Sequence, residues 1–193
     1  AIAASGLTSG NYDIAYVDGT LTVDKAALTV SSSDVTKTYD GTVTAAGTAV
    51  VTGGTLYGTD ALAGGTFAFD TADAGTGKTV TVSGVTVNDG NGGNNYAVTY
   101  AANTSSTVDK AALTVTANDD SKTYDRLAYS GGNGVAYSGF VAGEDENDLG
   151  GALVFGGSAQ GAVSAGGYAI AASGLTSGNY DIAYVDGTLT VDK

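Results

Sequence analysis

AIAASGLTSGNYDIAYVDGTLTVDK occupies residues 169–193, and the same 25 letters occupy residues 1–25. A self-match of this length at a fixed offset is the signature of a repeat array, and it decides how the rest of the chain is read. Residues 1–193 are therefore interpreted as one period of an array together with an overlap. The repeating unit is the level at which the fold is predicted.

Shorter echoes divide the period into two related modules. DKAALTV occurs at residues 24–30 and 109–115, and KTYD occurs at 37–40 and 122–125. The sequence thus predicts modules of about 85 residues each. The predicted pieces are the C-terminal half of a preceding second module, a first module and a second module, at residues 1–25, 26–110 and 111–193.

Short alternating runs of apolar and small polar residues predict an all-β fold. KTVTVSGVTV at residues 78–87 places Val80 and Val82 on one face of a strand, with Thr79 and Thr81 on the other. Regularly spaced short strands with Gly-rich turns are typical of small, immunoglobulin-like β-sandwiches. A β-grasp-like module with one short helical turn is the alternative, and that turn would lie in TDALAGG (59–65) or VAGEDENDLGG (141–151).

Turn chemistry gives two further expectations. Asp186-Gly187 lies between the alternating runs 180–185 and 188–191, which predicts a β-hairpin. The first module ends its KTYD motif with Gly41, whereas the second has Arg126 at that place. Because a left-handed backbone favours glycine, we expect the turn at Arg126 to be of another type.

The crossing between the modules predicts an extended rod. Residues 107–113, TVDKAAL, lead from the last strand of one module into the first strand of the next, with no Gly/Ser-rich linker. Modules joined without slack stack end to end. At about 3.3 Å per strand residue, each module should add roughly 35–45 Å.

Composition excludes several functions. The formal net charge is −13, which repels the phosphates of nucleic acids and anionic membranes. No run of 18 apolar residues is present, so membrane insertion is not expected. The chain has no Cys and no His, and no Gly-rich phosphate loop, so we expect no enzyme.

Two acidic loops are candidates for calcium, the only cofactor that the sequence suggests. Hard cations require several oxygen ligands. The candidate ligands are Asp89 and Asn91 in NDGNGGN, and Glu144, Asp145, Glu146 and Asp148 in GEDEND. Neither loop has the spacing of an EF-hand, and an ordinary solvated acidic loop is the alternative reading.

The Lys-x-Tyr-Asp motif is predicted to be structural. Its tyrosine should cover an edge of the core with its hydroxyl at the rim. The residues concerned are Lys37, Tyr39, Asp40 and Gly41 in the first module and Lys122, Tyr124 and Asp125 in the second. The rival hypothesis is that tyrosines form a platform that stacks on sugars.

The ordered motifs AALTV…KTYDG…NYAVTY…TVDK resemble the YDG-type repeat of large bacterial surface adhesins. AALTV…KTYD…GGYAI…SGLTSGNYDIAYVDGTLTV is similar to the related MBG-type repeat. The resemblance covers essentially the whole chain. It implies an extracellular place at the surface of Gram-negative bacteria, in filamentous-haemagglutinin-like or two-partner-secretion adhesins. It also implies a stalk in cell adhesion or biofilm formation, with no catalytic residues. A module that itself binds glycan or matrix is the alternative.

Residues 1–25 carry a prediction of their own. As half a module, they have apolar strand faces without the usual partners. Such strands pair readily with another chain. We therefore expect adjacent repeats as partners, and head-to-tail self-association into filaments through residues 1–25.

Overall fold

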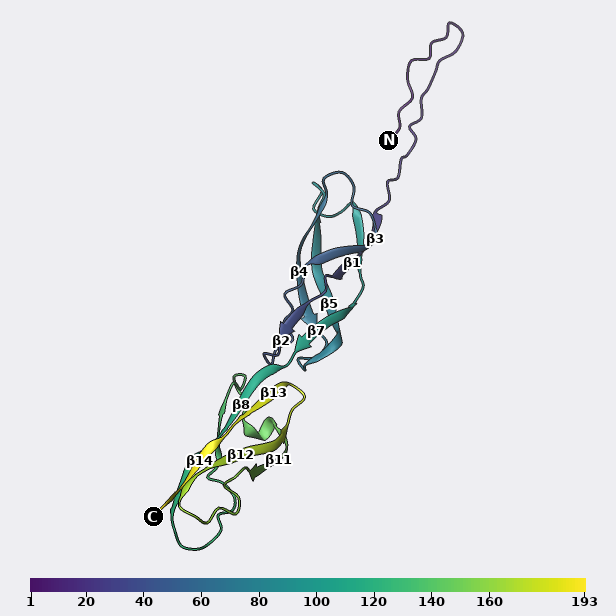
Figure 1. The fold of residues 1–193 in the computed structure, drawn as a ribbon. Coiled ribbons are helices and arrows are strands. Elements are labelled where there is room, and N and C mark those ends of the chain that lie inside the picture. Colours follow the sequence, from purple (N-terminus) through teal and green to yellow (C-terminus); the bar gives the residue numbers. More distant parts are fainter.

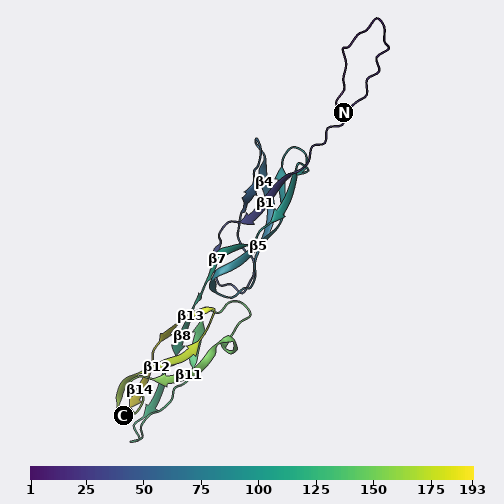
Figure 2. The same ribbon diagram turned by 90° about the vertical axis from the view of Figure 1, so that its right-hand side faces the viewer.

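The computed structural model describes all residues from 1 to 193, and nearly all of its regular structure is β-strand. Two folded modules lie end to end as a rod, and residues 1–25 form an open loop that projects beyond the first module (Figure 1). The view turned by 90° shows the same rod (Figure 2). The chain therefore begins at one end of the molecule and finishes at the other.

The first module contains two sheets. The three-stranded sheet has the order β3-β1-β6, and the four-stranded sheet has the order β2-β7-β5-β4. The pairs β1–β6 and β2–β7 are parallel, and the remaining pairs are antiparallel. The strands are β1 (Ala26–Ser32), β2 (Thr36–Thr38), β3 (Ala49–Gly54), β4 (Ala61–Phe69), β5 (Gly75–Asn88), β6 (Tyr96–Tyr100) and β7 (Asn103–Asp109).

The second module repeats this topology. Its sheets have the orders β10-β8-β13 and β11-β12-β14-β9, and the pairs β8–β13 and β9–β14 are parallel. The elements are β8 (Ala111–Ala117), β9 (Asp120–Thr123), β10 (Val135–Ser138), the 3₁₀ turn η1 (Glu146–Asp148), β11 (Gly150–Gly156), β12 (Gly166–Thr176), β13 (Tyr180–Val185) and β14 (Gly187–Asp192). The prediction of all-β modules is confirmed.

The alternating residues form the cores between the sheets. Val80 and Val82 of β5 are buried, as the alternation predicts. One cluster of buried residues lies within the first module, one lies within the second, and a third contains residues of both. No helix in the structure has the length and apolar character needed to cross a membrane.

The helical turn that the β-grasp alternative would place at residues 59–65 does not form. β4 begins at Ala61, and Leu62 and Gly64 pair with Val87 and Val85 of β5. Cross-strand pairing overrides the local capping signal there. Residues 141–151 do contain a short turn, η1, so only the second module has the helical turn that the β-grasp alternative requires of each.

The hairpin expected at Asp186-Gly187 is also wrong. β13 pairs with β8, whereas β14 pairs with β12 and β9, so the chain crosses from one sheet to the other at Asp186. Gly187 is needed for close approach, because a Cβ there would lie 2.5 Å from the carbonyl oxygen of Ala117. Alternation predicts which face of a strand is buried but not which sheet receives it.

The turn at Arg126 does not change type. Arg126 has a φ of 67°, close to the 72° of Gly41. The surrounding bonds are also the same, since the Asp125 carboxylate accepts from the backbone N–H of Leu127 at 2.9 Å. These bonds hold a left-handed conformation that the side chain of Arg126 alone would disfavour.

Candidate functional site

The modules meet at a compact contact that we call the joint. β7 ends at Asp109 and β8 begins at Ala111, so only Lys110 separates the strands of the two modules. Lys110 is itself held, because its Nζ donates to the carbonyl oxygen of Ser177 at 2.9 Å. The predicted taut crossing is therefore present, and side chains of both modules pack around it.

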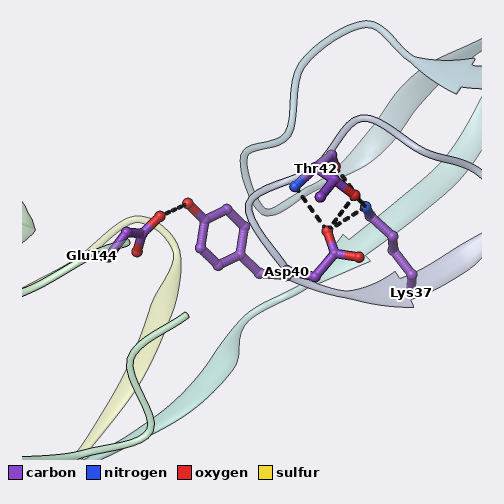
Figure 3. Close-up of polar contacts among 5 residues, drawn as sticks. Lys37, Asp40, Thr42 and Glu144 are labelled. Carbon is purple, nitrogen blue, oxygen red and sulfur yellow. Dashed lines mark hydrogen bonds and ion pairs between the residues drawn. The ribbon is translucent and has the colours of Figure 1, made fainter. Parts of the chain in front are cut away.

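Glu144 of the second module accepts hydrogen bonds from one tyrosine of each module. Tyr39 donates its hydroxyl to one carboxylate oxygen, and Tyr180 donates its hydroxyl to the other. The rings of Tyr39 and Tyr180 meet edge to face with centroids 5.7 Å apart. Figure 3 shows Glu144 approaching the loop that carries Asp40 from the second module's side. This carboxylate thus connects the two modules.

The KTYD turn positions Tyr39 for this contact. Lys37 Nζ lies 2.6 Å from Asp40 Oδ1 and donates to the carbonyl oxygen of Thr42, also at 2.6 Å (Figure 3). The same Asp40 oxygen accepts from the backbone N–H of Thr42. The bond from Lys37, followed by those from Thr42, lowers the pKa of Asp40 to about 2. In the first module, the motif thus holds Tyr39 in a contact with the neighbouring module.

Asn179 makes a second polar bridge across the joint. Its Oδ1 accepts from the backbone N–H of Ala74 at 3.0 Å, and its Nδ2 donates to Asp73 at 3.2 Å. Its own carbonyl oxygen accepts from the N–H of Ala111. The loop before β5 is therefore tied to the loop before β13.

Apolar packing continues through the joint without a break. One buried cluster contains residues of both modules, with partly buried side chains such as Phe140 packed against it. Phe140 also meets the Tyr180 ring edge to face at 5.6 Å. The buried members are Val35, Tyr39, Ala45, Phe69, Val80 and Val108 from the first module, and Ala111, Leu113, Val115 and Tyr180 from the second.

The tyrosines of the joint stay protonated over a wide pH range. The hydrogen bond to Glu144, followed by burial, raises the pKa of Tyr39 to about 12. Burial, and then the bond to Glu144, also raises the pKa of Tyr180. Both hydroxyls are thus donors to one carboxylate, an arrangement that stabilises the contact between the modules.

The first candidate calcium loop uses its carboxylate to hold its own backbone. Asp89 accepts from the N–H groups of Asn91, Gly93 and Asn95 at 2.8, 2.8 and 3.0 Å. The Asn91 side chain donates to Asn95. These bonds lower the pKa of Asp89, against the opposing effect of burial, which is the largest single influence.

The acidic residues of the second candidate loop have two different structural roles, one in the joint and one in capping η1. Glu144 belongs to the joint, whereas Asp145 caps η1 and Asp148 accepts from the Asp145 N–H at 2.9 Å. Glu146 is exposed on η1. No three acidic side chains in the structure are grouped closely enough to hold a metal ion. Calcium binding therefore stays a prediction that only the sequence motivates.

The KTYD motif of the second module repeats the Lys–Asp ion pair and the lysine-to-carbonyl bond, but no other module packs on it in this structure. Lys122 Nζ lies 2.7 Å from Asp125 and donates to the carbonyl oxygen of Leu127. Tyr124 is 47 % exposed, whereas Tyr39 is 8 % exposed. Tyr124 lines a shallow pocket with Ser164, Ala165 and Lys193, which hold the places of Asp73, Ala74 and Lys110. We call this surface the exposed C-terminal half-joint.

The opposite end of the first module carries the complementary half. The Tyr96 hydroxyl donates to Asp60 Oδ2 at 2.7 Å and accepts from the N–H of Tyr57 at 2.9 Å. Tyr180 makes the same two contacts, with Glu144 and with the N–H of Val141. We call the surface of Asp60, Tyr57 and Tyr96 the exposed N-terminal half-joint.

Sequence reasoning did not single out Asp60, and it named Glu144 only as a candidate calcium ligand, not as the partner of a tyrosine. Asp60 and Glu144 each lie 36 residues before the tyrosine that they bind. The N–H groups that donate to those tyrosines each lie 39 residues before them. This repeated spacing was the signal available in the sequence. It becomes visible only when the two modules are aligned on Asn95-Tyr96 and Asn179-Tyr180 and then compared toward the N-terminus.

Comparison with known families assigns the two modules separately. Residues 24–105 match the family model of the YDG domain, and residues 113–190 match that of the MBG domain (YGX type). The two stretches are thus similar to a YDG domain and to an MBG domain, in that order, and we refer to the two modules by these names. No curated protein and no solved structure matches the chain.

The domain assignments place the joint between two different repeat types. Residues 106–112, which contain the crossing at Lys110, lie between the stretches that match the YDG and MBG models. The Tyr39-Asp40-Gly41 sequence belongs to the YDG domain, and its acceptor Glu144 belongs to the MBG domain. The recognition of both repeat types from their ordered motifs is confirmed at the level of the domains.

Proposed function

We propose that this pair of domains is a structural repeat segment, a stalk that extends a distal binding domain of a secreted bacterial surface adhesin. The observation that carries the proposal is the apolar cluster that passes from the YDG domain into the MBG domain. A contact that continues the core resists bending, because any hinge motion must expose buried surface. The bonds of Glu144 and Asn179 fix the relative rotation of the domains.

The location at the surface of a Gram-negative bacterium belongs to the same proposal. It is supported by the tandem order of YDG and MBG domains and by the resemblance of the motifs to adhesin repeats. The high negative charge supports partners that are neither nucleic acids nor anionic membranes. The partners that we propose are adjacent repeats of the same protein, joined head to tail.

The stalk needs no catalytic group and no cofactor. Both oxygens of Glu144 already accept hydrogen bonds from tyrosine hydroxyls, and the oxygens of Asp89 accept hydrogen bonds from backbone N–H groups. We therefore expect EDTA to leave the melting temperature of the chain unchanged in calcium-containing buffer. A fall of several degrees that added calcium reverses would show that the ion holds one of these loops.

Small-angle scattering and a binding screen test the stalk together. β5 alone has 14 residues, so it spans about 45 Å at about 3.3 Å per residue. The two domains should scatter as a stiff rod longer than about 80 Å. A glycan and matrix-protein array should show no saturable binding. Scattering from two domains with variable separation would contradict the stalk.

The alternative is a module that binds glycan or a matrix partner directly. The observation in its favour is the exposure of Tyr57 and Tyr124, whose rings could stack on sugars. Both tyrosines lie in half-joints, however, and packing between repeats accounts for them. Saturable glycan binding that Tyr57→Ala or Tyr124→Ala abolishes would favour the alternative.

A further inference from the structure

We propose that each module is a mechanical clamp that resists tension along the rod. The stretch by which the chain enters a module and the stretch by which it leaves are bonded side by side, and we call their line of contact the seam. Tension shears the seam instead of peeling it open. The proposal rests on the stalk proposed above for the origin of the tension, whereas the resistance follows from the strand pairing.

The entering and leaving stretches of the first module run in the same direction. The chain enters through β1 and β2, at residues 26–38, and leaves through β6 and β7, at residues 96–109. β1 pairs with β6 in parallel, and β2 pairs with β7 in parallel. Because the two stretches point the same way, the chain enters the module at one end and leaves it at the other (Figure 1). Tension on the chain therefore pulls the two stretches in opposite directions along their length.

The seam of the first module is closed by a backbone hydrogen bond at each end. The N–H of Ala26 donates to the carbonyl oxygen of Asn95 at 2.9 Å where the chain enters. The N–H of Tyr39 donates to the carbonyl oxygen of Asp109 at 2.7 Å where the chain leaves. The evenly spaced bonds of the two parallel ladders lie between these ends. Bonds that are loaded along the strands must yield together, whereas bonds that are opened from one end yield one at a time.

Side chains continue the seam between β1 and β2, where neither ladder reaches. The hydroxyl oxygen of the buried Ser106 accepts from the N–H of Val35 at 3.0 Å. Asn103 Nδ2 donates to the carbonyl oxygen of Ser32 at 3.0 Å and to Asp34 Oδ1 at 2.8 Å. The seam is therefore bonded through this interval as well as along the two ladders.

The core covers one face of the seam. Leu28 and Val30 of β1 are 1 % and 0 % exposed, and Val108 of β7 is 1 % exposed. A hydrogen bond is stronger in surroundings of low dielectric constant, and buried neighbours keep away the water that would replace the bond as it lengthens. The bonds of the seam are therefore protected on the side that faces the core.

The second module repeats the seam at the corresponding positions. The entering strands β8 and β9 pair in parallel with the leaving strands β13 and β14. The N–H of Ala111 donates to the carbonyl oxygen of Asn179 at 3.0 Å at one end of this seam. Between the two ladders, the N–H of Thr188 donates to Asp119 Oδ1 at 2.7 Å. Two modules of different sequence thus pair their first and last strands in the same way.

A single run of chain joins the two seams in series. Residues 95–109 leave the first module, Lys110 follows, and residues 111–124 enter the second. A load along the rod therefore passes from one seam to the next through covalent bonds. β3 and β5 are bonded only sideways to this path, β3 through β1 and β5 through β7. The seams are thus the parts of the modules that tension must break first.

Pulling the same chain in two directions tests the clamp. The sequence has no cysteine, so two introduced cysteines define where force is applied to the full-length chain. Lys25→Cys with Asp109→Cys loads the seam in shear, and Lys25→Cys with Asn94→Cys peels the same seam from its first bond. All three residues are exposed. At one loading rate, we expect the shear pair to rupture at a force about two- to threefold higher, because its bonds must yield together. Equal forces in the two directions would overturn the clamp.

Two serine variants of identical composition test whether the load follows the seam. Ser106→Ala and Ser33→Ala each remove a hydroxyl that accepts from a backbone N–H. Only Ser106 bridges the two stretches, because Ser33 accepts from Thr48. Under a constant load in shear, Ser106→Ala should unfold about tenfold faster and Ser33→Ala less than about twofold faster. An unchanged rate for Ser106→Ala, or an equal change in both variants, would overturn the seam as the path of the load.

The direction of pulling separates this role from ordinary destabilisation. When the seam is peeled, the bond from Ala26 to Asn95 yields first and the Ser106 bond is reached late. Ser106→Ala should therefore change the unfolding rate in that direction less than about twofold. Equal acceleration in both directions would reflect only lost stability and would overturn the path of the load. A chain that scatters as a stiff rod but ruptures equally in both directions would keep the stalk and lose the clamp.

Discussion

Replacing Tyr39 with phenylalanine removes one hydrogen bond across the joint and almost nothing else. The Tyr39 hydroxyl donates to Glu144, and the ring packs edge to face on Tyr180, so Tyr39→Phe keeps the ring. A hydrogen bond to a charged group contributes about 1.5–3 kcal/mol when it is protected from water. Glu144 is only half-buried, so water can replace part of the lost hydrogen bond. We therefore expect Tyr39→Phe to lower the free energy of unfolding by about 1–2 kcal/mol.

Tyr124→Phe is the matched control, since the two variants have the same composition. Tyr124 holds the same place in the motif but makes no bond to another module. Urea unfolding should show a fall of about 1–2 kcal/mol for Tyr39→Phe and less than about 0.5 kcal/mol for Tyr124→Phe. The corresponding drop in melting temperature is about 2–8 °C for Tyr39→Phe. Equal stabilities for the two variants would refute the contribution of Glu144 to the joint.

Three further perturbations test other parts of the molecule. The pKa of Tyr39 is raised to about 12, so its hydroxyl stabilises the fold fully below about pH 10, and this contribution is lost as the pH rises through 12. The difference in the free energy of urea unfolding between wild type and Tyr39→Phe should therefore vanish between about pH 10 and 12. Asn179→Ala should lower the free energy of unfolding by about 1–2 kcal/mol, whereas Asn11→Ala, its counterpart in residues 1–25, should leave the urea midpoint unchanged. Arg126→Gly should raise the free energy of unfolding by about 0.5–1 kcal/mol, and with it the melting temperature, because glycine adopts the φ of 67° without strain. An unchanged or lower melting temperature would mean that the hydrogen bonds of Asp125 and Lys122 already remove the strain.

Period-two alternation predicted most of the strands correctly. Val80, Val82 and Tyr96 are buried because side chains of a strand alternate between faces, and this property is local. The taut crossing at Lys110 was also predictable, since no flexible residues separate two runs that are typical of strands. Local patterns suffice for features of this kind.

Features that depend on distant partners were not predictable from local pattern. Asp186-Gly187 looks like a hairpin turn, but β13 and β14 find their partners in different sheets. Glu144 was read as a calcium ligand because acidic neighbours surround it in sequence, whereas its partners in space are two tyrosine hydroxyls. Arg126 kept the turn of Gly41 because two hydrogen bonds outweigh the preference of one residue: Leu127 N–H donates to the Asp125 carboxylate, and Lys122 Nζ donates to the carbonyl oxygen of Leu127.

The central claim is that the YDG and MBG domains move as one body about the crossing at Lys110. Residual dipolar couplings of backbone amides in a weakly aligned sample measure this directly, because each domain reports its own alignment tensor. We predict one common tensor, with the same magnitude and orientation, for residues 26–109 and 111–192 in the arrangement of Figure 1. Tensors of clearly different magnitude in the two domains would mean that they reorient independently, and would contradict the stalk.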